Sequence, residues 1–104
     1  MRENTQKINY TEFKTKCTTY CPIGKDYYTA DIEIVIKNQK KIPDYEVIDD
    51  FLRVEMNGKV LTHEDLNRVI YDKIYELFEP EYLRVDVISN TIMNIKTTIE
   101  SEDN

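Results

Sequence analysis

The chain has 104 residues, 40% of them apolar and 33% charged, which fits one small domain. Its 14 Lys and Arg residues stand against 20 Asp and Glu residues, a net charge of -6, so any binding of nucleic acid must rely on a local basic surface. No apolar run is long enough for a membrane span or a secretory signal. Two cysteines and one His favour neither a disulfide staple nor a zinc site. We therefore expect a cytoplasmic protein with no metal site and no membrane partner.

We expect a flexible N-terminal arm over residues 1–10, a single domain over 11–101 and a tail over 102–104. Within the domain, apolar and polar side chains alternate over residues 11–19 and again over 28–37. This alternation predicts two half-buried strands joined by a turn that contains proline and glycine.

Two helices are predicted next. The first follows Asp44, a typical N-cap residue, and ends before Gly58, with apolar residues at helical spacing at Val47, Ile48, Phe51, Leu52 and Val54. The second begins at Thr62, whose spacing to Asp65 resembles a capping box, and is ended by Pro80. Its apolar stripe consists of Leu66, Val69, Ile70, Ile74, Leu77 and Phe78.

Residues 83–87 predict a third strand. Ser89 and Asn90 predict a tight turn, and residues 91–100 predict a fourth strand. The order β-β-α-α-β-β predicts an α+β fold in which two helices cover one face of an antiparallel sheet. Such a sheet has open edges, so pairing with neighbouring subunits in a closed multi-subunit barrel is a natural hypothesis.

Cys21 precedes Pro22, which predicts an irregular turn for this cysteine and not a position in a strand ladder. Two interpretations remain open from the residues alone. The thiol is either a small buried filler, or a nucleophile near the charges of Lys25 and Asp26. Cys17, on the inward side of the first strand, is interpreted as filler.

His63, Glu64 and Asp65 open the second helix. Acids in a first helical turn complement the helix dipole, and this alone can explain them. Alternatively, a carboxylate at this position can accept two N–H donors from a guanine-like edge. Among the eight tyrosines, three lie near the turn and could stack on a planar base: Tyr20, Tyr27 and Tyr28.

Four features together resemble the QueF family of the tunnelling fold over about residues 13–101: the element order, the "CPIGK" turn, "THEDLNRVIYDKIYELFEPEYLRVDV" and "IMNIKTTIES". The resemblance is closest to the short archaeal QueF-like archaeosine synthases. It implies the tunnelling fold (T-fold), a homo-oligomer built as pentamers that pair into a decamer, and tRNA carrying 7-cyano-7-deazaguanine as the substrate.

The resemblance also implies a reaction. A cysteine thiolate adds to the nitrile carbon of the base and forms a thioimide, which ammonia then converts to a formamidine without any cofactor. By position, Cys21 matches the nucleophile, while His63 and Glu64 match the pair that lines the pocket and holds the base. The family's acid stands seven residues after the cysteine, where this chain has Tyr28, so Asp26 becomes the proton donor if the turn is shortened.

Two departures favour the amidine-forming branch over the NADPH-dependent nitrile reductases. The chain has "YEVIDDFLRV" where the reductases carry a Glu-Ser-Lys-Ser-Leu-Lys type run, and "SNTIMNIKTT" lacks their glycine pair. The reductase is the runner-up, and a non-catalytic binding module is the third hypothesis. Binding of tRNA requires the lysines to gather around each pocket of the assembled particle, namely Lys14, Lys16, Lys25, Lys37, Lys40 and Lys41.

Overall fold

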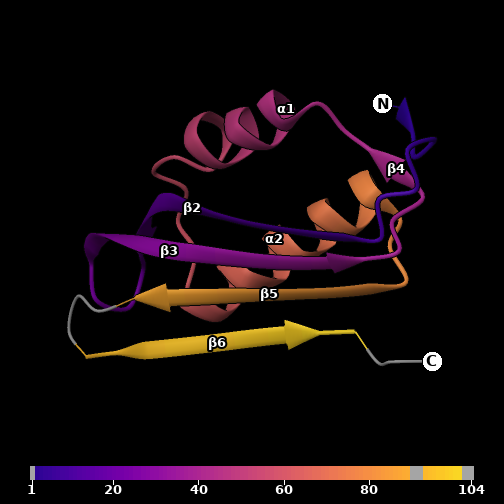
Figure 1. Cartoon of the computed structure of the whole chain (residues 1–104). Coiled ribbons are helices and arrows are strands. Elements are labelled where there is room, and N and C mark those ends of the chain that lie inside the picture. The colour runs from indigo at the N-terminus through magenta and orange to yellow at the C-terminus, as the bar shows by residue number, and fades with distance from the viewer. Residues whose placement is uncertain (1, 90–92, 102–104) are drawn as a thin grey trace.

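The computed structural model describes residues 2–89 and 93–101 as a sheet with helices packed on one face (Figure 1). The antiparallel sheet has the order β2-β3-β5-β6 and is formed by β2 (Tyr10–Cys21), β3 (Asp26–Lys37), β5 (Tyr82–Ser89) and β6 (Ile95–Glu100). The helices are α1 (Tyr45–Asp50), its five-residue π-helical continuation η1 (Phe51–Glu55) and α2 (His63–Phe78). This is the predicted α+β arrangement.

The alternation of side chains along β3 separates the two faces of the sheet. Its buried residues face the helices and are Tyr28, Ala30, Ile32, Ile34 and Ile36. The residues between them are polar or half-buried and face away from the helices, because successive side chains of a strand point to opposite faces.

Strand β2 is longer than predicted, and the prediction that Cys21 lies outside a strand ladder is wrong. Cys21 is the last residue of β2 and lies directly opposite Asp26 of β3. The residue before a proline prefers an extended backbone, which a strand also requires. Pro22, which has no N–H to donate, falls just beyond the ladder, so the strand can run up to it.

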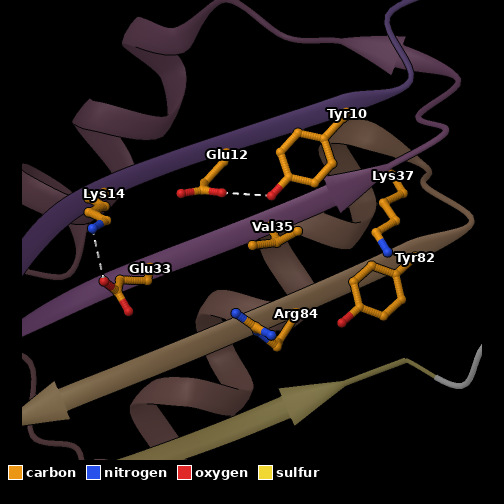
Figure 2. A pocket seen from close by; sticks show the side chains of 8 residues that line it. All are labelled: Tyr10, Glu12, Lys14, Glu33, Val35, Lys37, Tyr82 and Arg84. Carbon is orange, nitrogen blue, oxygen red and sulfur yellow. Dashed lines mark hydrogen bonds and ion pairs between the residues drawn. The ribbon is translucent and has the colours of Figure 1, made fainter.

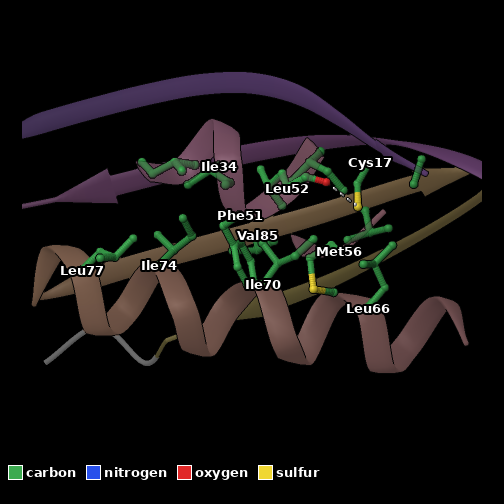
Figure 3. Close-up of a cluster of buried hydrophobic side chains, with 14 of the residues drawn as sticks. Cys17, Ile34, Phe51, Leu52, Met56, Leu66, Ile70, Ile74, Leu77 and Val85 are labelled. Atoms are coloured by element: carbon green, nitrogen blue, oxygen red, sulfur yellow. Dashed lines mark hydrogen bonds between the residues drawn. The ribbon is translucent and has the colours of Figure 1, made fainter. Parts of the chain in front are cut away.

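The helices bury one continuous apolar core against the sheet (Figure 3). Five residues of α2 are buried there, as the predicted stripe indicates: Leu66, Ile70, Ile74, Leu77 and Phe78. From α1, η1 and the following residue come Ile48, Phe51, Leu52 and Met56. The core also includes Cys17, so the prediction that this residue faces inwards is confirmed.

The predicted stripe of the first helix is wrong at Val47 and Val54, which are 44% and 71% exposed. The helix widens at Phe51, whose carbonyl accepts the N–H of Met56, five residues further on. Around this wider turn Leu52 and Met56 are buried, and Val54 lies in solvent.

A second, small sheet lies at the end of the molecule away from Cys21. There β1 (Arg2–Glu3) pairs with β4 (Lys41–Ile42), so part of the segment expected to be a flexible arm contributes a short strand. The predicted turn at Asn90 and the first residues of the predicted fourth strand, Thr91 and Ile92, lie outside the described residues. No helix in the described part of the chain is long and apolar enough to cross a membrane.

Candidate active site

A cavity of about 230 Å³ lies at the end of the sheet where β2 turns into β3. The sequence-predicted residues Cys21, Asp26 and His63 all line it. Its remaining walls are Gly24, Tyr27, Tyr28, Ser89, Met93 and Ile95. Three of the four predicted site residues, which come from two distant parts of the sequence, are therefore brought to one place.

The hairpin between β2 and β3 aims a hydrogen-bond donor at the Cys21 sulfur. The Gly24 N–H donates to Cys21 Sγ at 3.3 Å, and the Lys25 N–H donates to the Cys21 carbonyl at 2.8 Å. Lys25 closes the turn with a left-handed backbone, φ 55°. The thiol is half-buried, receives this N–H and borders the cavity, so its sulfur is open to a molecule bound there.

Asp26 lies directly opposite Cys21 in the ladder, so both side chains point to the same face of the hairpin. Only four residues, 22–25, connect them. One carboxylate oxygen of Asp26 accepts the N–H of Tyr27 at 2.8 Å, which holds the carboxyl group at the mouth of the cavity. The hairpin register thus places Asp26 beside Cys21 at the cavity.

Tyr28 occupies the neighbouring ladder position, opposite Thr19, on the same face. Its hydroxyl donates to the Leu61 carbonyl at 2.9 Å, and burial raises the pKa of the phenol. A phenol that already donates its proton to a carbonyl and holds it more tightly than usual is a poor acid catalyst. Asp26 is therefore the better candidate for the family's acid.

His63 reaches the cavity because residues 58–61 run along the outer edge of β2. Tyr20 N–H donates to the Lys59 carbonyl at 2.9 Å, and Leu61 N–H donates to the Tyr20 carbonyl at 3.0 Å. Thr62 then caps α2 by accepting the N–H of Asp65 at 3.2 Å, which confirms the predicted helix start. His63 follows as the first residue of the helix.

The His63 ring is fixed by a bond to the sheet. Nε2 lies 2.8 Å from the carbonyl oxygen of Val87, which can only accept, so this nitrogen carries the hydrogen. In the neutral ring Nδ1 is then the acceptor that remains for a bound molecule. Half-buried and anchored to β5, His63 can orient a ligand beside Cys21 without moving its own backbone.

Glu64 is the predicted site residue that the structure does not bring into the cavity. It is exposed in the first turn of α2 and is not among the lining residues. Sequence reasoning in turn missed Ser89, Met93 and Ile95, which lie around the connection from β5 to β6. These three carry no motif, and only the position of that connection beside the β2–β3 turn places them at the site.

Cys17 has the opposite surroundings to Cys21. It is 2% exposed, and its thiol donates to the Leu52 carbonyl at 3.4 Å. Burial raises the pKa of this thiol to about 11. Cys17 therefore stays protonated at neutral pH and serves the core. Within residues 2–89 and 93–101, no group of three or more His, Cys, Asp or Glu side chains could hold a metal ion.

A second hollow, of about 360 Å³, lies on the sheet face away from the helices (Figure 2). Its charges are largely matched with each other. Lys14 lies 3.3 Å from Glu33, and the Tyr10 hydroxyl donates to Glu12 at 2.6 Å. This hollow has no thiol or imidazole, so the Cys21 cavity is the better candidate for a reactive site.

The fold and the thiol-lined cavity define a class first: a small α+β chain with a cysteine next to the turn of its first long hairpin. No protein-family model matches the chain, and no curated protein matches it in sequence. Among solved structures, the chain is similar to that of "the archaeosine synthase QueF-Like in the apo form", with a TM-score of 0.83 and 21% identity over 90% of this chain and 94% of the other. The resemblance to QueF-like proteins is thereby confirmed at the level of the fold.

Proposed function

We propose that the chain is a tRNA-modification enzyme that converts 7-cyano-7-deazaguanine in tRNA to archaeosine. The observation that carries the proposal is the single cavity that unites Cys21, Asp26 and His63. The similarity of the whole fold to an archaeosine synthase supports the same reaction class.

In the proposed reaction the Cys21 sulfur attacks the nitrile carbon, and Asp26 takes up the thiol proton and gives a proton to the nitrile nitrogen. The product is a thioimide, with one new C–S bond and the C≡N triple bond reduced in order to C=N. Ammonia then attacks the same carbon, the C–S bond breaks, and the thiol returns to Cys21. The base leaves as a formamidine, so the step consumes ammonia and needs no electron donor.

The surroundings of each residue support its part in this scheme. The Gly24 N–H, 3.3 Å from Sγ, gives the sulfur a hydrogen-bond donor before attack and after release. His63, anchored through Nε2, is proposed to line the base pocket. Glu64 is proposed to accept N–H groups from the guanine-like edge, and its place outside the cavity wall means that a bound base must extend towards the start of α2.

The proposal is tested by intact-mass measurement after incubation with the free nitrile base. The wild type is expected to gain the full mass of the base, because addition expels nothing. Cys21→Ala is expected to gain nothing, while Cys17→Ala keeps the adduct. Asp26→Asn is expected to slow adduct formation by about 100-fold, the lower range for general acid catalysis. A wild-type protein that forms no adduct contradicts the proposal.

The same adduct distinguishes the two enzyme branches. Ammonia is expected to discharge it to the formamidine, with the mass of the protein restored. If NADPH discharges it to an amine and ammonia does not, the chain is a nitrile reductase instead. Binding of the base without any adduct, unchanged in Cys21→Ser, would instead indicate a non-catalytic binding module.

A further inference from the structure

The basic side chains divide sharply into those that are already engaged and those that are not. Of the 14 Lys and Arg residues, all of which are described, eight lie in ion pairs with carboxylates: Arg2, Lys14, Lys16, Lys41, Arg53, Arg68, Arg84 and Lys96. Two more, Lys37 and Lys73, sit over aromatic rings. Of the six lysines expected to gather around each pocket of the assembled particle, three lie in these ion pairs, Lys14, Lys16 and Lys41.

The remaining four lysines lie in two places. Lys25 is in the hairpin turn that ends at Asp26, and Lys59 is in the segment whose carbonyl accepts the Tyr20 N–H beside that turn. Both are exposed and lie at the cavity end of β2. Lys7 and Lys40 lie at the opposite end of the sheet, where β2 begins opposite Lys37.

Tyr27 belongs to the same end of the sheet and follows Lys25 by two residues in the hairpin. It is 60% exposed and forms part of the cavity wall. Its ring meets the Tyr20 ring edge to face, with centroids 5.2 Å apart and planes at 77°. A Cβ built on Gly58 would lie only 3.9 Å from the Tyr27 ring, so the 58–61 segment approaches it closely as well. Tyr27 is thus held in place and still offers ring surface to a ligand.

We infer that Lys25, Tyr27 and Lys59 form a rim that binds single-stranded RNA beside the nucleotide whose base enters the cavity. The two cations would contact flanking phosphates, and Tyr27 would stack on a neighbouring base. This inference rests on the proposed function, because a base can reach the Cys21 sulfur only when it is turned out of its stack. The negative net charge of the chain makes such a local basic and aromatic rim necessary.

Salt-dependent binding of an unmodified tRNA transcript tests the two lysines. The slope of log affinity against log salt concentration is expected to fall by about 0.7 for each phosphate that is no longer neutralised, hence by about 1.4 in Lys25→Gln/Lys59→Gln. The matched control is Lys7→Gln/Lys40→Gln, which removes the same charge at the far end of the sheet and is expected to keep the wild-type slope. An unchanged slope in the first variant, or an equal fall in both, overturns the inference.

Tyr27 is tested in the same assay. Tyr27→Ala is expected to weaken binding about tenfold, the scale of one base stacked on an aromatic ring, while Tyr27→Phe retains the ring and the affinity. Equal loss of affinity in both variants contradicts stacking. Thermal melting confirms that each variant is folded. The RNA-binding assay needs no nitrile, so it is independent of adduct formation. If the wild-type protein forms the adduct but its RNA binding does not depend on the rim, only this inference is refuted. Wild type that forms no adduct refutes the proposed function.

Discussion

The two thiols of β2 lie on the same face of one strand and differ in what surrounds them. Cys17 is 2% exposed and donates to a carbonyl, whereas Cys21 is half-buried, lines a cavity and accepts an N–H. Alkylation at neutral pH is therefore expected to modify Cys21 at least about 10-fold faster, because the Cys17 thiol is buried and burial raises its pKa. Peptide mapping by mass spectrometry measures the two rates, and comparable rates would contradict the assigned roles.

The buried Cys17 thiol also leads to a prediction about how the stability of the fold depends on pH. Burial raises the pKa of its thiol from 9.0 to about 11, so the folded protein keeps this proton while the unfolded chain loses it. The stabilising contribution is fully present below pH 9 and is lost as pH rises through 11. Between these limits the free energy of unfolding should fall by about 2 kcal/mol more in the wild type than in Cys17→Ala. Urea titrations across this range measure it, and parallel curves would refute the burial argument.

At the scale of elements, the segment over residues 58–61 links the fold to the site. It is bonded to the edge of β2 through Thr18 and Tyr20, and it delivers the chain to Thr62, where α2 begins. The start of the helix is thereby fixed relative to the hairpin that carries Cys21. The place of His63 in the cavity depends on this contact as well as on its own bond to β5.

The cap of α2 can be tested by substitution. Thr62→Ala removes the acceptor of the Asp65 N–H and is expected to lower the free energy of unfolding by about 1 kcal/mol. Thr62→Ser keeps the hydroxyl and should cost much less. Chemical denaturation distinguishes the two, and equal losses would show that the methyl group, not the cap, stabilises this turn.

Much of the arrangement of strands and helices follows from the sequence. The alternation along residues 28–37 and the stripe of α2 locate β3 and its covering helix, because those periods match buried faces. The π-helical turn after Asp50 does not follow from the sequence. The apolar spacing fits an ordinary helix, and nothing local marks the bond from the Met56 N–H to the Phe51 carbonyl five residues before it.

At the scale of the whole molecule, the sheet has two edges with different exposure. The outer edge of β2 is covered by residues 58–61 near Cys21, while no other described segment forms a backbone hydrogen bond with that edge over residues 11–16. The Tyr20 N–H points away from β3 and donates to the Lys59 carbonyl. Because every second residue of an edge strand points its N–H outwards, the Lys16 N–H also points away from β3. This stretch of β2 and the outer edge of β6 are the places where a second copy could pair.

The proposed assembly therefore has a sharp test. Light scattering coupled to size exclusion is expected to give a mass that is a multiple of 12.4 kDa, ten chains under the predicted pair of pentamers. Lys16→Pro removes an outward N–H and keeps the β3 ladder, so it should reduce the mass. Lys16→Ala should leave it unchanged. A wild-type protein that elutes as a single chain refutes the assembly.

The sequence by itself determined the order of the elements, the inward place of Cys17 and the cap of α2, because hydrophobic period and capping residues act over a few neighbouring positions. It also singled out Cys21, Asp26 and His63, through resemblance. Only the tertiary structure decided that these three share a cavity, since their approach depends on the hairpin register and on bonds between residues far apart in the chain. It likewise decided which lysines remain unpaired, because ion pairs form across strands and leave no local mark in the sequence.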